Sequence, residues 1–378
     1  MTNTKPELDE FLAQLAREAQ PGDRLPTIRE LMRRFSVSQA IVQRAFDSLK
    51  SQGLIASEVG RGTYFRGGSA SPSSASAPAP ARANNGPRSV LLLRRSVSVH
   101  RGRVLIELLQ RRFAADGHKV LEVSYTDPDH ARTVLRGLPR FDACVIQSSF
   151  RTIPIDLLAA VREKSEVLAV DGAALVGTDV EAVGMEWGEP LGRAVAMLRA
   201  RGHGAIAYVT TSQPLFAVQM GRRRLASLQS ELGDEVALHE IALPQLPDGG
   251  YAEALVEALR EQAQAGRLPF TALVAWGIEN GAALREALAQ LGCKVPSDLS
   301  VVLLGRTDLP NEHADFFETI GCSVEDQAEA LYQAVAQRWA NPATPFGVRL
   351  IPVTRREGAS VAAPARGARG KGRLTAAA

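Results

Sequence analysis

Residues 21–49 read PGDRLPTIRELMRRFSVSQAIVQRAFDSL, and this stretch decides the fold of the first part of the chain. Thr27 and Glu30 have the spacing of a capping box, so a helix is predicted to begin at Ile28. The turn FSVS at 35–38 ends that helix. A further helix follows, because apolar residues recur at helical spacing: Ile41, Val42, Ala45, Phe46 and Leu49. Two short helices joined by such a turn predict a helix-turn-helix.

The flanking segments extend this motif to a winged helix-turn-helix. A helix is predicted before it from apolar residues at helical spacing: Leu8, Phe11, Leu12 and Leu15. After it, residues 54–56 and 63–65 predict two short strands, and the glycines within 59–62 suit the tip between them. In domains of this kind the second helix of the motif enters the major groove and presents its N-terminal residues to base edges.

The order and spacing of these motifs over about residues 7–66 resemble the DNA-binding domain of GntR-type bacterial regulators. The resemblance implies a double-stranded DNA operator as partner. It also implies DNA contacts from the second helix, the start of the third helix and the wing. The residues at those positions are Arg29, Ser38, Gln39, Ala40, Gln43, Arg44, Arg61 and Gly62.

Glutamines stand where the resembled family commonly carries other residues. Arginine and threonine are common at positions 39–41 there, and arginine is common where this chain has Gln43. Because glutamine pairs with adenine and arginine with guanine in the major groove, we expect an operator shifted from the family's usual one. Arg33 and Arg34 are open to two interpretations, a contact with DNA phosphate or a solvated helix face.

Composition divides the chain into segments. Residues 67–88 are rich in Gly, Ser, Ala and Pro and contain no large apolar side chain, so they predict a flexible linker. This linker separates a domain at 1–66 from a longer domain at 89–358, and residues 359–378 predict a disordered basic tail. The net charge of +3 hides an uneven distribution, because residues 22–66 alone carry 8 basic and 4 acidic side chains.

From residue 89 onward, strands and helices alternate. Short continuous apolar runs such as Val90–Leu93, Ala143–Ile146 and Val301–Leu304 are typical of strands buried in parallel sheets. Amphipathic segments such as Val104–Phe113 lie between the runs. The pattern predicts an α/β domain, and its length predicts two parallel sheets.

Several segments of this domain resemble LacI/GalR-type regulators. They are FDACVI at 141–146, VLAVD at 167–171, RGHGAIA at 201–207, VPSDLSVV at 295–302 and RREGAS at 355–360. The resemblance implies a bilobal, periplasmic-binding-protein-like fold with a small-molecule effector in the cleft between the lobes. It further implies a homodimer formed through helices of the first lobe, for which Val104–Phe113 is the candidate.

Ligands of open α/β folds bind beyond the carboxyl ends of the strands. The candidate effector-binding residues are Arg95, Ser96, Gln147, Ser148, Asp171, Arg222, Trp276 and Asp308. A sugar or related metabolite is the ligand that the resemblance implies. Positions 186–187 and 277–278, where the family usually has DN and ND, read EW and GI here. The alternative is therefore an effector-independent, architectural DNA-binding protein whose cleft no longer takes a ligand.

The remaining patterns argue against other classes of protein. No catalytic motif and no metal-ligand spacing occurs, so we expect no enzyme activity, no metal and no cofactor. The cysteines at 144, 293 and 322 are far apart, and we expect buried reduced thiols. Neither a membrane-spanning apolar run nor a signal peptide is present, so we expect a cytoplasmic protein without a membrane partner.

Overall fold

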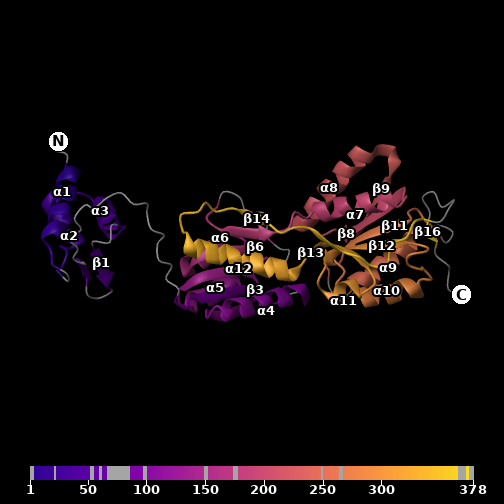
Figure 1. Ribbon diagram of the computed structural model, residues 1–378, viewed down its shortest axis with the longest axis horizontal. Helices are drawn as coiled ribbons and strands as arrows, with labels where there is room; N and C mark the ends of the chain where they lie inside the picture. Colours follow the sequence, from indigo (N-terminus) through magenta and orange to yellow (C-terminus); the bar gives the residue numbers. More distant parts are fainter. Residues whose placement is uncertain are drawn as a thin grey trace, which may run out of the picture. The chain divides into compact units, whose positions relative to one another are not determined.

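A computed structural model gives the fold (Figure 1). It describes residues 4–20, 23–51, 55–58, 62–65, 86–96, 100–148, 152–172, 178–247, 250–263, 267–364 and 372–373. The chain divides into two compact units, Met1–Arg82 and Ala83–Ala378. Most of the expected linker, and the expected tail apart from residues 359–364 and 372–373, lie outside the described residues.

The first unit is a winged helix-turn-helix, as predicted. Its elements are α1 (Thr4–Glu18), α2 (Ile28–Phe35), α3 (Gln39–Ser51), β1 (Ile55–Glu58) and β2 (Gly62–Phe65). The two strands are antiparallel, with Ile55 opposite Phe65. The core contains at least one apolar side chain from every element, each at most 5% exposed: Leu8, Leu12, Leu31, Val42, Phe46, Ile55 and Phe65.

The first lobe of the second unit contains a parallel sheet in the order β14-β7-β6-β5-β3-β4. Its strands are β3 (Ser89–Arg95), β4 (Lys119–Tyr125), β5 (Phe141–Gln147), β6 (Ser165–Asp171), β7 (Glu181–Gly184) and β14 (Val348–Leu350). Its helices are α4 (His100–Ala115), α5 (Pro128–Gly137), α6 (Ile155–Lys164) and α12 (Val324–Ala340). Side chains alternate between the two faces of the sheet. Val90 and Leu92 therefore pack with α4 and α12, whereas Leu91 and Leu93 pack with α5 and α6.

The second lobe repeats this arrangement with a sheet in the order β15-β13-β12-β11-β8-β9, parallel except for β15. Its strands are β8 (Ala205–Thr211), β9 (Ala237–Leu243), β11 (Ala272–Trp276), β12 (Ser300–Arg306), β13 (Glu318–Cys322) and β15 (Thr354–Arg356). Its helices are α7 (Glu189–Ala200), α8 (Phe216–Leu232), η1 (Gly233–Glu235), α9 (Tyr251–Gln262), α10 (Gly281–Gln290) and α11 (Pro310–His313). A separate pair joins β10 (Arg267–Leu268) to β16 (Gly372–Arg373). The predicted α/β domain with two parallel sheets is thus confirmed.

The chain crosses between the lobes three times within the described residues. The crossovers are residues 185–188 between β7 and α7, residue 323 between β13 and α12, and residues 351–353 between β14 and β15. Figure 1 shows these connections converging between the two sheets. Because each lobe is completed by a late segment of the chain, the lobes cannot separate into independent domains. They can, however, rotate about the short connecting segments.

The second lobe continues past residue 358, where we expected the tail to begin. Val301 N–H donates to the Ser360 carbonyl oxygen at 2.9 Å, and Glu318 N–H donates to Ser360 Oγ at 2.8 Å. His203 Nε2 lies 2.9 Å from the Ala362 carbonyl oxygen. These bonds extend the edge of the lobe at positions that composition alone assigns to a basic tail. No helix in the described residues is long and apolar enough to cross a membrane.

Candidate DNA interface and ligand-binding cleft

The helix-turn-helix begins at the predicted capping box. Glu30 N–H donates to Thr27 Oγ1 at 3.3 Å, and Thr27 N–H donates to Glu30 Oε2 at 2.7 Å. The hydrogen bonds from Thr27 hold the pKa of Glu30 below its usual value. Ser36 adopts the left-handed conformation, with φ of 51°, and ends α2. Both ends of α2 are therefore fixed by local contacts, which sets the position of the turn into α3.

The N-terminal turn of α3 carries the predicted base-reading residues. Val42 N–H donates to the Ser38 carbonyl oxygen at 3.3 Å, so the helix starts directly after Ser38. Ser38 and Gln39 are exposed and Gln43 is half-buried, whereas Val42 belongs to the core. Ala40 and Arg44 lie on the same helix and Arg29 on α2, but the side chains of these three residues are outside the described part of the structure.

The wing is tied to the segment that precedes α2. Leu25 N–H donates to the Thr63 carbonyl oxygen at 2.8 Å, and Phe65 N–H donates to the Asp23 carbonyl oxygen at 2.9 Å. Gly62 begins β2 opposite Glu58. The predicted contact residue Arg61 lies outside the described residues. The anchoring of β2 next to α2 brings the base of the wing and the helix-turn-helix into one rigid unit.

Arg33 and Arg34, for which the sequence allows either a DNA contact or a solvated helix face, differ in their surroundings. The Arg34 guanidinium carbon lies 4.1 Å from the centre of the Phe11 ring and 5.5 Å from that of Phe35. This geometry is a cation–π contact that joins α2 to α1, which favours a structural role for Arg34. Arg33 is exposed on the same helix.

Most of the predicted effector-binding residues lie at the carboxyl edges of the two sheets. Arg95 ends β3, Gln147 ends β5, Asp171 ends β6 and Trp276 ends β11. Ser96, Ser148 and Asp308 follow β3, β5 and β12. Arg222 lies on α8 instead, where its Nε is 2.6 Å from Glu240 Oε1 and its Nη2 donates to the Thr211 carbonyl oxygen at 3.3 Å.

A buried arginine that the sequence analysis missed joins the two lobes. Arg101, on α4 of the first lobe, is 5% exposed. Its Nε lies 3.0 Å from Glu312 Oε1 and 3.5 Å from Glu279 Oε1, and both glutamates belong to the second lobe. Its Nη2 donates to the Ile278 carbonyl oxygen at 3.4 Å, across 177 residues of sequence. No local sequence pattern predicts a contact between residues so far apart in the chain.

A second buried group lies beside this ion pair. Arg306 N–H donates to Glu312 Oε2 at 2.8 Å, so Glu312 receives contacts from both lobes. Asp171 accepts a hydrogen bond from Gln327 of α12. Burial raises the pKa of Asp171 to about 6, and the positive charge of Arg306 opposes part of that rise. The cleft between the lobes therefore contains charged side chains that compensate one another.

Asp308, Gln147 and Trp276, like Arg222 and Asp171, have contacts within the protein. Asp308 accepts hydrogen bonds from Ser323 Oγ and Val324 N–H, both at 2.8 Å, and thereby caps α12 at a crossover. Gln147 Nε2 donates to the Gly102 carbonyl oxygen at 3.1 Å. Trp276 is 4% exposed and packs in the hydrophobic core. A ligand would have to displace these contacts or bind beside them.

The cysteines lie as the sequence predicts. All three cysteines are buried and free, as expected, and burial raises the pKa values of the Cys144 and Cys293 thiols. Within the described segments, no group of three or more His, Cys, Asp or Glu side chains could hold a metal ion.

Two known domain families match the chain in separate regions. Residues 12–65 match the bacterial regulatory proteins of the gntR family, and residues 195–361 match the periplasmic binding protein-like domain. The chain therefore combines a GntR-type DNA-binding domain with a periplasmic-binding-protein-like domain. This is the composition of a DNA-binding transcription regulator. No curated protein matches the sequence significantly.

Solved structures of LacI-family regulators share the fold. One from Enterococcus faecium, with bound ribose, is 17% identical and has a TM-score of 0.58, covering 73% of this chain and 99% of its own. One from Weissella paramesenteroides, with bound glucose, is 18% identical with a TM-score of 0.59 and the same coverage. The Escherichia coli repressor ascG is 19% identical with a TM-score of 0.58, covering 73% and 100%. These likenesses establish a LacI-type fold.

The raised pKa of Asp171 makes the stability of the second unit depend on pH. Because the folded chain binds this proton more tightly than the unfolded chain does, stability is lost as the pH rises from about 4 to about 6. The loss should reach up to about 3 kcal/mol. Asp171→Asn keeps an oxygen acceptor for Gln327 and cannot ionise, so it should remove this loss. Urea unfolding at pH 4.5 and 7.5 measures the effect.

The matched control for this test is Asp129→Asn, since Asp129 is an exposed carboxylate on α5. It should retain the pH dependence of the wild type. If Asp171→Asn retained it too, the raised pKa of Asp171 would be refuted.

Proposed function

We propose that this protein is a ligand-responsive, sequence-specific transcription regulator that acts in the cytoplasm as a homodimeric repressor. A small molecule, with a sugar as the first candidate, would bind in the interlobe cleft and control affinity for a palindromic operator. The observation that carries this proposal is the combination of a GntR-type DNA-binding domain with a bilobal, periplasmic-binding-protein-like domain. Gln39 and Gln43 at the start of α3 further support an operator that contains adenine at the positions they read.

The contacts at α12 suggest how the signal would travel. The N-terminus of this helix is capped by Asp308 of the second lobe, whereas its body packs on α4 and β6 of the first lobe. A rotation of the lobes must therefore change the position of α12 relative to one of them. The outward face of α4 carries the exposed residues Arg103, Glu107 and Arg111. If α4 lies in the dimer interface, lobe rotation changes the spacing of the two DNA-binding domains.

The second candidate function is effector-independent DNA binding. The observation that favours it is the buried contact of Arg101 with Glu279 and Glu312, because these side chains hold the lobes together without a ligand. In this alternative the second unit serves as a fixed dimerisation and spacing module.

Thermal unfolding of the full chain against a library of sugars and related metabolites separates the two candidates. A ligand at 100 times its Kd stabilises the folded state by about 2.7 kcal/mol. The ligand-responsive proposal predicts a clear rise in Tm for at least one compound of the library. An unchanged Tm with every compound would instead favour the effector-independent alternative.

The DNA contacts are tested by titrating the full chain with labelled DNA from upstream of its own operon, at fixed salt. Arg29→Ala and Arg61→Ala should each weaken binding by about tenfold or more, because each removes a cation from the predicted interface. Arg260→Ala on α9 removes an exposed arginine of the second unit and should leave the affinity unchanged. Equal affinity for all four proteins would show that these two arginines do not contact DNA.

A further inference from the structure

A row of polar residues lies at the carboxyl edge of the first-lobe sheet. Arg95 and Tyr125 are paired in register at the ends of β3 and β4, Ser148 continues the row after β5, and Gly172 follows after β6. Side chains alternate along a strand, so Arg95 lies on the same face as Leu93, which packs with α5 and α6. A Cβ at Gly172 would lie 3.9 Å from Ser148 Oγ, so the absence of a side chain there leaves the serine hydroxyl uncovered. The row thus presents a cation and hydroxyl groups toward the predicted cleft.

Two buried polar atoms of this row have no partner in the described part of the protein. Tyr125 is fully buried, and its hydroxyl makes no hydrogen bond there. Arg95 Nε is also buried without a hydrogen-bond partner, and the guanidinium carbon lies 5.6 Å from the centre of the Tyr125 ring. Burial raises the pKa of Tyr125, and the positive charge of Arg95 opposes part of that rise. Unsatisfied buried polar groups are costly, so a hydrogen-bond acceptor supplied by a ligand would stabilise this position.

The carboxylates around this row in the first lobe do not compensate Arg95. Those on β4, α5 and the start of α6 are engaged with other groups: Glu122 with Arg94, Asp129 and Asp156 with Arg132, and Asp127 with the N-terminus of α5. Asp171 lies on the opposite face of the sheet, where Gln327 of α12 donates to it. The segments outside the described residues that follow β3, β5 and β6, at 97–99, 149–151 and 173–177, contain no acidic residue. The row therefore attracts an anion.

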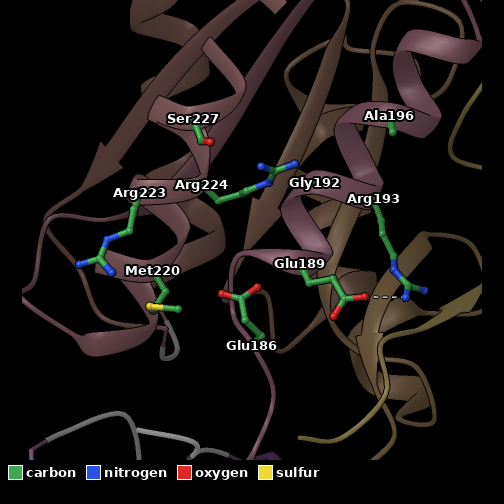
Figure 2. A pocket seen from close by; sticks show the side chains of 9 residues that line it. All are labelled: Glu186, Glu189, Gly192, Arg193, Ala196, Met220, Arg223, Arg224 and Ser227. Carbon is green, nitrogen blue, oxygen red and sulfur yellow. Dashed lines mark hydrogen bonds and ion pairs between the residues drawn. The ribbon is translucent and has the colours of Figure 1, made fainter. Parts of the chain in front are cut away.

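The hollow between α7 and α8 of the second lobe lacks such an arrangement (Figure 2). Its volume is about 630 Å³, but the side chains of Arg223 and Arg224 point in opposite directions and the Glu186 carboxylate lies in the same space. Arg224 Nη1 is in addition paired with Glu231 Oε1 at 2.9 Å. The charges of the hollow therefore do not converge on one ligand group, in contrast to the row around Arg95.

We propose that the ligand of the interlobe cleft carries an anionic group, a carboxylate or a phosphate, that binds to Arg95. This inference rests on the proposed ligand-responsive function and specifies the class of ligand. The forked N–H groups of an arginine match both anions. The Tyr125 hydroxyl donates a further hydrogen bond to the same group, and the Ser148 hydroxyl is next in the row for a hydroxyl of the ligand. The preferred ligand is then a sugar acid, a sugar phosphate or a related anionic metabolite rather than a neutral sugar.

The position of Arg95 gives such a ligand a route to the lobe arrangement. The connection from β3 to α4 begins directly after Arg95, and Ser96 N–H at its start donates to the Tyr125 carbonyl oxygen at 2.8 Å. The same connection leads to Arg101, which pairs with Glu312 of the second lobe. An anion bound at Arg95 therefore acts at the base of the segment that carries the interlobe ion pair.

Calorimetric titration of the full chain with two matched pairs of probes tests the inference: ribose with ribose 5-phosphate, and glucose with gluconate. We expect at least one acid to bind about tenfold or more tighter than its neutral partner, and the acid that binds identifies the anionic group. Arg95→Gln should lose about tenfold or more in affinity for that acid, with any binding of the neutral sugar unchanged. The matched control Arg136→Gln removes an exposed arginine in the last turn of α5, at the other end of the lobe, and should bind as the wild type does.

A second variant keeps the outcome interpretable if Arg95→Gln fails to fold. Tyr125→Phe removes a hydroxyl that makes no hydrogen bond within the described residues, so it should fold and still weaken binding of the acid. Binding of a neutral sugar but of neither acid, or wild-type affinity of a folded Arg95→Gln for the acid, would overturn the inference and leave the ligand-responsive function standing. Absence of binding by all four probes would also overturn it, and the Tm measurements with the metabolite library then decide whether the proposed function stands.

Discussion

The buried contact of Arg101 with Glu312 and Glu279 is the constraint on which the second unit depends. A buried charge is costly unless it is paired, and Arg101 reaches its two carboxylate partners only when the lobes are together. Glu312 also accepts the Arg306 N–H, so movement of the lobes disturbs both arginines. The relative position of the lobes is therefore set by electrostatic pairing as well as by the crossovers.

This constraint connects the parts of the proposed regulator. Arg101 lies near the start of α4, and α4 packs along α12, whose N-terminus is capped by Asp308 of the second lobe. A ligand in the proposed cleft site would act on this lobe arrangement. In the proposed homodimer, the DNA-binding domain would need no direct contact with the cleft, because the arrangement of the lobes would act through the surface that joins two copies of the chain.

Local sequence patterns predict the helices and strands of this protein, but they do not predict its long-range contacts. The capping box of Thr27 and Glu30 and the alternating strands and helices follow from spacing within a few residues, and the structure contains them. The position of Asp308 after a strand predicts a ligand-binding residue but gives no sign that its carboxylate also caps α12. The contact between Arg101 and Glu312 depends on the packing of two lobes, so no local sequence pattern predicts it. Composition likewise does not predict the hydrogen bonds of Ser360 with β12 and β13, because a segment of small residues such as ASVAAP is typical of a tail.

The most direct test of the account is whether the arrangement of the lobes controls affinity for DNA. The variant Arg101→Met, Glu279→Gln, Glu312→Gln removes the interlobe ion pairs without leaving a buried charge unpaired and without touching the DNA-binding domain. Its affinity for operator DNA is measured by fluorescence anisotropy against that of the wild type, with circular dichroism to show that both are folded. The account predicts a change of at least about fivefold. A folded variant with wild-type affinity would contradict it.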